Sequence, residues 1–286
     1  MRIGAVFPQL EIGNDPATIA RWATEVERMG FRHILAFDHV IGAGVDTRPG
    51  WRGYTSENPF HEVFVLFGYL AAVTTDVELV TGVLILPQRQ TALVAKQAAE
   101  VDVLSDGRMR LGIGVGWNQV EYEVLGERFD NRGARVEEQI ELMRALWADP
   151  TITFEGSSHR VDNAGINPRP VQGRIPVWIG GYAEPVLRRV GRLADGWLPQ
   201  GAPDTKMAED VARVRRYAED AGRSATDVGF EARLTVARTP RESWGDFLAG
   251  WRELGATHLA VDTMGLGLTD AQAHLDLLQE VLAAEA

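Results

Sequence analysis

The chain has 286 residues, no cysteine, 29 lysines and arginines and 40 aspartates and glutamates, which gives a formal charge of −11. The absence of cysteine excludes disulfides, a thiol nucleophile and cysteine-ligated zinc or iron–sulfur sites. The negative charge argues against a nucleic-acid-binding protein, which needs a cationic surface. The sequence shows no signal-peptide features and no apolar run of the roughly 18 residues that span a bilayer, so we expect a cytoplasmic protein with no membrane partner.

Strand-like apolar runs alternate with helical runs from one end of the chain to the other. The first strand is predicted over residues 3–7. Asp15 and Pro16 then open a helix, because Asp is a good N-cap and Pro fits the first helical position, and Gly30 ends it. The remaining strands are expected over 33–37, 77–86, 109–115, 176–179, 196–198, 228–236 and 258–262, and the remaining helices over 60–74, 91–104, 132–147, 184–193, 205–221, 241–254 and 270–284.

Residues 149–175 interrupt this alternation, since 151–156 and 159–161 read as a small hairpin and a proline-containing loop follows. Outside this insertion the chain holds eight strand–helix units, in a length typical of a (β/α)8 TIM barrel. We therefore expect residues 1–286 to form one α/β barrel domain with an insertion before strand five. The alternative, a doubly wound open sheet, needs a G-x-G-x-x-G motif in the first strand–helix turn, and residues 8–15 lack it.

In such a barrel the chemistry lies at the C-terminal ends of the strands. The second strand ends in Asp38-His39, where a carboxylate beside an imidazole can supply an acid/base group; the alternative is a histidine that only bonds a carbonyl in a turn. The third strand carries Thr81-Gly82-Val83. A glycine inside a strand marks a bulge or the close approach of a ligand, although barrel closure alone also accounts for a bulge.

Glycines also mark the ends of the fourth and fifth strands. The run Gly112-Ile113-Gly114-Val115-Gly116 leaves bare backbone that suits a flat ring; the alternative is that small residues let neighbouring elements pack. Gly180-Gly181-Tyr182 leads directly into a helix, whose free N–H groups bind anions, unless this is only a tight turn. The long loop over residues 40–59 holds two aromatic side chains, Trp51 and Tyr54, and is typical of a lid or substrate wall.

Two other chemistries are disfavoured. The two lysines, Lys96 and Lys206, fall on helices, so neither suits a Schiff base at a strand end. The six histidines show no metal-binding spacing, and no acidic cluster completes a site, so we expect no metal.

Together these segments resemble the bacterial-luciferase-like flavin and deazaflavin oxidoreductases. The strongest likeness lies in residues 94–108 (VAKQAAEVDVLSDGR), which continue into Leu111-Gly112-Ile113-Gly114-Val115-Gly116-Trp117. The supporting segments follow in the family's order and are Thr81-Gly82-Val83 and residues 132–135, 168–172, 179–181 and 194–197.

The resemblance implies a TIM-type barrel with an insertion before strand five and a flavin-type ring at the strand ends, supported by a bulge with a non-prolyl cis peptide at Gly82-Val83. It also implies that Asp38-His39 lies near the reactive carbon of the ring, that Gly180-Gly181 holds the cofactor phosphate, and that the protein is a homodimer. The predicted catalytic residues are His39 and Asp38, and the predicted cofactor-binding residues are Asp38, Thr81, Gly82, Val83, Gly114, Gly116, Asn118, Gly180, Gly181 and Tyr182.

The chain looks most similar to the deazaflavin (coenzyme F-420) branch of the family. Several dehydrogenases of that branch carry a catalytic glutamate after the strand-four glycines, where this chain has Val115, although it keeps Asn118. The predicted function is hydride transfer between C5 of a deazaflavin and an organic small molecule. His39 would act as the acid/base or orienting donor, and Asp38 would hold polar groups of the ring or of His39. The alternatives are an FMN-dependent monooxygenase that uses reduced flavin and oxygen, and a non-catalytic flavin-binding or partner-binding barrel.

Overall fold

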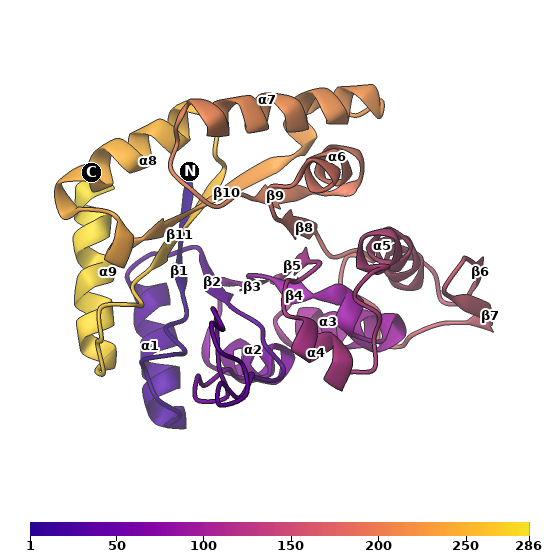
Figure 1. Cartoon of the computed structure of the whole chain (residues 1–286), viewed down its shortest axis with the longest axis horizontal. Helices are drawn as coiled ribbons and strands as arrows, with labels where there is room; N and C mark the ends of the chain where they lie inside the picture. Colours follow the sequence, from indigo (N-terminus) through magenta and orange to yellow (C-terminus); the bar gives the residue numbers. More distant parts are fainter. Residues whose placement is uncertain (286) are drawn as a thin grey trace.

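The structure is a computed structural model that describes residues 1–285, and in this range a parallel sheet closes into an eight-stranded barrel (Figure 1). The third barrel position holds two short strands, β3 and β4, and both pair with β5, which closes the circle. This confirms the predicted luciferase-like (β/α)8 fold. The barrel strands are β1 (Arg2–Val6), β2 (His33–Ala36), β3 (Glu78–Thr81), β4 (Leu84–Ile85), β5 (Met109–Gly114), β8 (Val177–Gly180), β9 (Gly196–Leu198), β10 (Gly229–Thr235) and β11 (His258–Asp262).

The helices lie around the outside of the strands (Figure 1). Their starts follow the predicted capping chemistry: the Asp15 carboxylate accepts a hydrogen bond from the backbone N–H of Thr18 at 2.9 Å. Within the described residues, none of these helices is both long and apolar enough to cross a membrane. Their bounds are α1 (Pro16–Arg28), α2 (Val63–Val73), α3 (Thr91–Leu104), α4 (Gln119–Val124), α5 (Arg132–Ala148), α6 (Glu184–Leu193), α7 (Thr205–Asp220), α8 (Trp244–Glu253) and α9 (Ala271–Glu285).

The third strand differs from its prediction. The apolar run 77–86 is not one strand, because Gly82 and Val83 separate β3 from β4, and a 3-10 turn (Leu86–Gln88) begins directly after β4. The pattern of apolar residues is continuous across this break, so sequence periodicity could not reveal it. The short helix α4 was also not predicted, since six residues are too few to display a helical period.

The insertion before the fifth barrel strand contains the predicted hairpin, formed by β6 (Ile152–Glu155) and β7 (Arg160–Ala164). The hairpin projects past α5 at one side of the molecule (Figure 1). His159 fastens it to the barrel, because Nδ1 hydrogen-bonds Glu138 of α5 at 2.7 Å and Nε2 lies 2.6 Å from the Thr91 hydroxyl of α3. The hairpin is therefore tied to two barrel helices.

The barrel interior is apolar in the middle and charged at the N-terminal ends of the strands. The apolar part is a cluster separate from the larger core between strands and helices, and its buried members are Val6, Leu35, Phe37, Val80, Trp178, Leu198, Ala260 and Met264. Below it, at the N-terminal ends of the strands, the Glu231 carboxylate accepts a hydrogen bond from Nε2 of His33 at 2.8 Å and pairs with Arg110. Burial opposes ionisation, but the neighbouring guanidinium and imidazole hold the pKa of Glu231 well below its usual range. A charged cluster at this end fits a stabilising role, since barrel chemistry occurs at the opposite end.

This charged cluster makes stability depend on pH through His258. Burial, together with the nearby Arg110 guanidinium, lowers the pKa of His258 to about 3. The unfolded imidazole takes up a proton below about pH 6.5, whereas the folded one resists it, so stability should fall as the pH falls from about 6.5 towards 3. We expect His258→Gln to lose less free energy of unfolding between pH 7 and pH 5 than the unchanged protein, as measured by urea unfolding. Equal losses in both proteins would contradict this assignment.

Candidate active site

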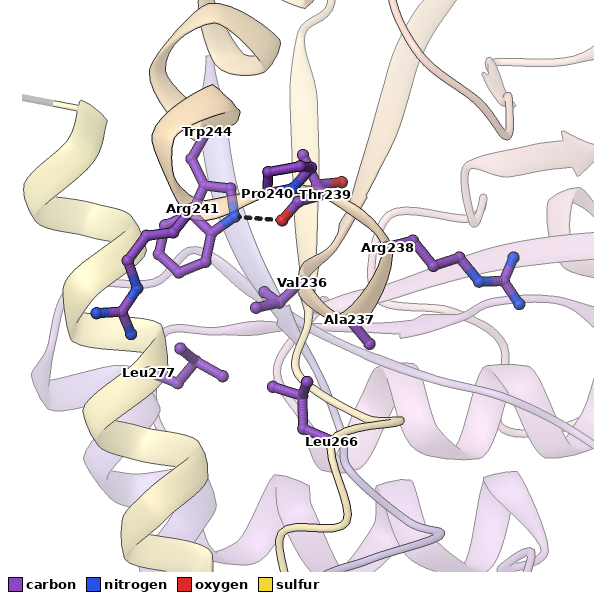
Figure 2. A pocket seen from close by; sticks show the side chains of 9 residues that line it. All are labelled: Val236, Ala237, Arg238, Thr239, Pro240, Arg241, Trp244, Leu266 and Leu277. Carbon is purple, nitrogen blue, oxygen red and sulfur yellow. Dashed lines mark hydrogen bonds between the residues drawn. The ribbon is translucent and has the colours of Figure 1, made fainter.

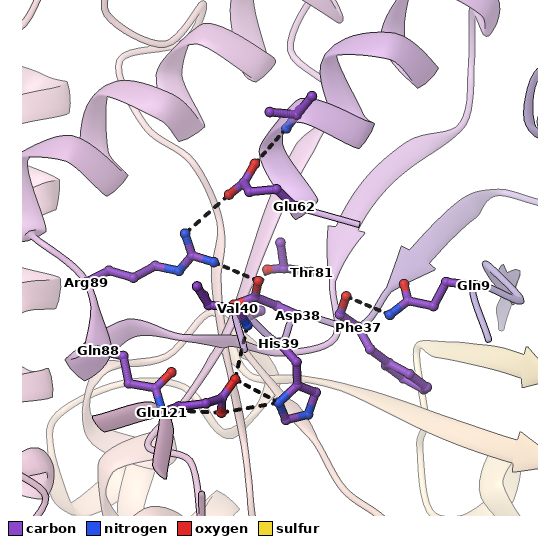
Figure 3. Close-up of polar contacts among 12 residues, drawn as sticks. Gln9, Phe37, Asp38, His39, Val40, Glu62, Thr81, Gln88, Arg89 and Glu121 are labelled. Carbon is purple, nitrogen blue, oxygen red and sulfur yellow. Dashed lines mark hydrogen bonds and ion pairs between the residues drawn. The ribbon is translucent and has the colours of Figure 1, made fainter. Parts of the chain in front are cut away.

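His39 lies at the C-terminal mouth of the barrel, just after β2, and is held by a glutamate from another segment of the chain. Its Nδ1 lies 3.1 Å and 3.2 Å from the two carboxylate oxygens of Glu121, on α4 (Figure 3). Glu121 is 1% exposed and also accepts a hydrogen bond from the backbone N–H of Val40 at 3.0 Å. Burial raises the pKa of Glu121, but the bonds from His39 and Val40 outweigh it and leave this pKa below its ordinary value.

An ionised Glu121 fixes the state of the imidazole. The carboxylate is a hydrogen-bond acceptor only, so Nδ1 of His39 carries a proton. In the neutral ring the lone pair then lies on Nε2, which has no hydrogen-bond partner among residues 1–285. His39 thus presents a proton-accepting nitrogen, and when it is protonated the buried carboxylate stabilises the imidazolium.

Asp38 has a different partner from the one expected. Its buried carboxylate accepts a hydrogen bond from Arg89 at 2.7 Å, and the same guanidinium lies 3.2 Å from Glu62 (Figure 3). Burial raises the pKa of Asp38 in spite of the Arg89 charge. The carboxylate does not hydrogen-bond the imidazole, so the predicted holding of His39 by Asp38 is corrected: Glu121 performs that task. The proposed contact of Asp38 with a cofactor ring stays a prediction.

Aromatic rings surround the imidazole. The His39 ring centroid lies 4.8 Å from both Tyr54 and Phe60, and 6.3 Å from Trp117. Tyr54 comes from the 40–59 loop, which agrees with its interpretation as a wall of the site, and Trp51 of the same loop packs against Trp117 at 5.8 Å. Trp117 stays 49% exposed, so the wall offers an apolar face to a planar molecule at the mouth.

The peptide bond between Gly82 and Val83 is cis, as the family resemblance implied. The Val83 side chain lies between two predicted site glycines. A Cβ atom added to Gly114 would lie 2.7 Å from one methyl group of Val83, and a Cβ atom added to Gly180 would lie 2.9 Å from the other. These glycines therefore make room for Val83 in the centre of the mouth, and their contact with a cofactor stays a prediction.

Substitution at this contact should destabilise the folded protein. We expect Gly114→Ala to lower the free energy of unfolding by about 1–3 kcal/mol, because the new methyl group overpacks the Val83 site. The double variant Gly114→Ala with Val83→Ala should recover part of this loss. The control is Gly68→Ala in α2, where no atom lies within 4 Å of the added Cβ and a gain of about 0.5–1 kcal/mol is expected. Denaturant unfolding measures all three, and an unchanged stability of Gly114→Ala would refute the packing role.

Three further predicted cofactor residues have structural tasks. The Thr81 side chain is fully buried, and its hydroxyl donates a hydrogen bond to the carbonyl of Gly112 at 2.6 Å, where β3 meets β5. Asn118 caps α4, because its side-chain oxygen accepts from the backbone N–H of Val120 at 3.1 Å. Gly116 has a positive φ of 68°, which favours glycine at the turn from β5 into this helix.

Gly180-Gly181-Tyr182 lies where β8 turns into α6. The turn is fastened by the indole N–H of Trp197, which donates to the carbonyl of Gly181 at 2.7 Å. Gly181 has a φ of 122°, which only glycine adopts readily. No side chain caps the start of α6, and the Tyr182 ring is 70% exposed. The turn thus presents backbone to the mouth, and its role in holding a phosphate stays a prediction.

Sequence reasoning missed Glu121 and Arg89, the partners of the two predicted catalytic residues. The family resemblance places a catalytic glutamate at position 115, where this chain has Val115. Glu121 instead contacts the imidazole from six residues further on, on a helix that was not predicted. No local pattern signals this contact, because 82 residues separate His39 and Glu121.

A shallow pocket of about 390 Å³ lies beyond the C-terminal end of β10, and His39 is not among its lining residues. It is bounded by the turn after β10 and by α8 and α9, and the Trp244 indole donates to the Thr239 carbonyl at 3.0 Å at its edge (Figure 2). Arg238 extends away from the other lining side chains (Figure 2). The lining residues are Val236, Ala237, Arg238, Thr239, Pro240, Arg241, Trp244, Leu266 and Leu277.

The closed barrel, the hairpin inserted before β8 and the cis peptide at the mouth together are typical of one protein family. The model of the luciferase-like monooxygenase family matches residues 3–283, so the chain belongs to this family. The structure superposes on an F420-dependent secondary alcohol dehydrogenase with a TM-score of 0.81 and 17% identity, covering 100% of this chain and 99% of that one. A monooxygenase of Streptomyces bottropensis gives a TM-score of 0.79 with 16% identity and 99% coverage of both chains. These likenesses show the shared fold.

Among individual relatives, an uncharacterized protein of Mycobacterium tuberculosis is 38% identical over 179 residues, which is 63% of this chain and 62% of that protein. An FMNH(2)-dependent dimethylsulfone monooxygenase of Pseudomonas fluorescens is 31% identical over 66% of this chain and 52% of the relative. An F420-dependent glucose-6-phosphate dehydrogenase of Mycolicibacterium fortuitum is 30% identical over 63% of this chain and 56% of the relative. The chain thus aligns with less than two thirds of the length of each of these three relatives.

Proposed function

We propose that this chain is a coenzyme F-420-dependent oxidoreductase that transfers a hydride between the deazaflavin and an organic small molecule. The observation that carries the proposal is His39, whose Nδ1 is held by Glu121 and whose Nε2 is unpartnered beside the aromatic wall. Hydride transfer to or from an organic carbon is accompanied by proton movement, and an imidazole in this state can accept or return that proton.

The residues at the mouth fit a planar cofactor. Gly82, Val83 and Gly181 are half-buried at strand ends, and the rings of Trp117 and Tyr182 are exposed. At the start of α6, Pro185 has no N–H and those of Val186 and Leu187 bond the Ala183 carbonyl, so the backbone of residues 181–184 is the part that we assign to an anionic cofactor group. A bound deazaflavin supplies the carbon that accepts or donates the hydride.

The residues of the chain perform the remaining tasks. Nε2 of His39 takes the proton from the polar group of the substrate, or returns it in the reverse direction. Glu121 keeps the ring oriented and stabilises its protonated form. Tyr54, Phe60 and Trp117 exclude water from one side of the imidazole, which strengthens its interaction with Glu121.

Titration of the purified protein with coenzyme F-420 and with FMN, followed by fluorescence and calorimetry, tests the proposal. We expect the deazaflavin to bind at least tenfold more tightly than FMN. Tight binding of neither cofactor would overturn the proposal. The alternative, an FMN-dependent monooxygenase, is favoured by the likeness to the dimethylsulfone monooxygenase, and oxygen uptake with reduced FMN but no deazaflavin turnover would support it.

A further inference from the structure

Arg233 of β10 is a half-buried cation inside the barrel. It stands in register with Ala260 of β11, which belongs to the interior cluster, and residues in register on parallel strands face the same side of a sheet. Its guanidinium carbon lies 5.1 Å from the ring centroid of Phe37, two residues before His39. Arg233 forms no hydrogen bond or ion pair within residues 1–285, so its guanidinium donors are free.

A second arginine extends the same side of the mouth. Arg238 follows β10 in a short 3-10 turn, is exposed, and has no ion-pair partner among the described residues. Both arginines act electrostatically on the phenol of Tyr54, which contacts the His39 ring. Both cations therefore lie within electrostatic reach of Tyr54, whose ring borders His39.

The acids near these arginines form no ion pair with them within the described residues. Asp262 is 7% exposed, one of its carboxylate oxygens accepts a hydrogen bond from the backbone N–H of Met264 at 3.1 Å, and burial raises its pKa although the charge of Arg233 opposes this. Glu11 accepts from the backbone N–H groups of Gly265 and Gly267 at 2.9 Å and 3.2 Å. In a chain with 40 acidic residues and a net charge of −11, an interior arginine without an ion pair within residues 1–285 differs from Arg110, the arginine at the other end of the barrel interior, which pairs with two carboxylates.

We infer that the β10 side of the mouth binds a carboxylate group of the substrate, with Arg233 as the main donor and Arg238 as a second one. A guanidinium matches a carboxylate because two parallel N–H donors meet two acceptor oxygens. This inference rests on the proposed function, and it narrows the organic partner to molecules that carry an acid group on an apolar or aromatic frame. The cofactor's anionic part has a separate place at the start of α6, which follows β8, two strands away in the barrel.

Calorimetry with benzoate and the neutral benzamide, at low ionic strength and with no cofactor present, tests the inference. We expect the unchanged protein to bind benzoate at least tenfold more tightly than benzamide. Arg233→Met should abolish this preference, Arg233→Lys should keep part of it, and Arg238→Met should weaken it by a smaller factor. The matched control is Arg21→Met on the exposed face of α1, which should leave the preference unchanged.

Equal binding of the two probes, or a preference that survives Arg233→Met, would overturn the inference. A parallel titration of each variant with coenzyme F-420 should give affinities within twofold of the unchanged protein. A tenfold loss of cofactor affinity in Arg233→Met would assign the arginine to the cofactor and would also overturn the inference. If the protein binds neither cofactor but keeps an Arg233-dependent preference for benzoate, the proposed function fails while the carboxylate site stands.

Discussion

Replacing Glu231 with alanine is expected to lower the free energy of unfolding by about 3–5 kcal/mol, because it leaves Arg110 and His33 without their shared carboxylate inside the barrel. The Arg110 guanidinium would keep its position 4.5 Å above the Trp178 ring, where little water can reach it. Urea unfolding at pH 7 measures the effect, and a midpoint shift without a change in slope would show that stability alone has changed.

The control for this substitution is Glu78→Gln. Glu78 also pairs with Arg110, at 3.1 Å, but its side chain is 22% exposed, so water replaces part of the lost interaction. We expect a loss of about 1 kcal/mol or less. If Glu231→Ala were no more destabilising than Glu78→Gln, the buried cluster would not stabilise the barrel as described.

Replacing His39 with alanine is expected to slow hydride transfer by about 10²–10⁴-fold while leaving cofactor affinity nearly unchanged, since a positioned acid/base group contributes this range. The measurement is the single-turnover change in deazaflavin absorbance, in the reaction that the unchanged protein catalyses. A rate within threefold of the unchanged protein would remove His39 from the chemistry. Retained cofactor binding, with no redox activity in either protein, would favour the non-catalytic barrel instead.

Glu121→Gln separates positioning from proton transfer. The amide keeps the size of the side chain but loses the charge that stabilises the protonated imidazole. Its rate should therefore fall less than that of His39→Ala, because the amide oxygen can still accept the hydrogen bond from Nδ1 of His39. A rate equal to that of the unchanged protein would mean that the charge of Glu121 has no part in the reaction.

The sequence alone was sufficient for most of the architecture. Apolar runs alternated with helical stripes, caps such as Asp15 set helix starts, and the break in this rhythm located the hairpin within residues 149–175. The order of glycine-rich strand ends also indicated the family, including the cis bond at Gly82-Val83. Two predictions were wrong. The strand predicted over 77–86 is two short strands, and helix α4 was not predicted. Both β4 and α4 have too few residues to display a period in the sequence.

The sequence determined which residues stand at the strand ends, because strand ends follow from local apolar patterns and from the glycines and polar residues that stop them. It placed His39 and Asp38 at the mouth in this way. Only the tertiary structure decided the partners of these two residues: Glu121 for His39 and Arg89 for Asp38. It also left Arg233 without an ion pair within residues 1–285. The physical reason is that barrel closure brings residues 51 to 121 positions apart into contact, and no local pattern encodes which distant side chains meet.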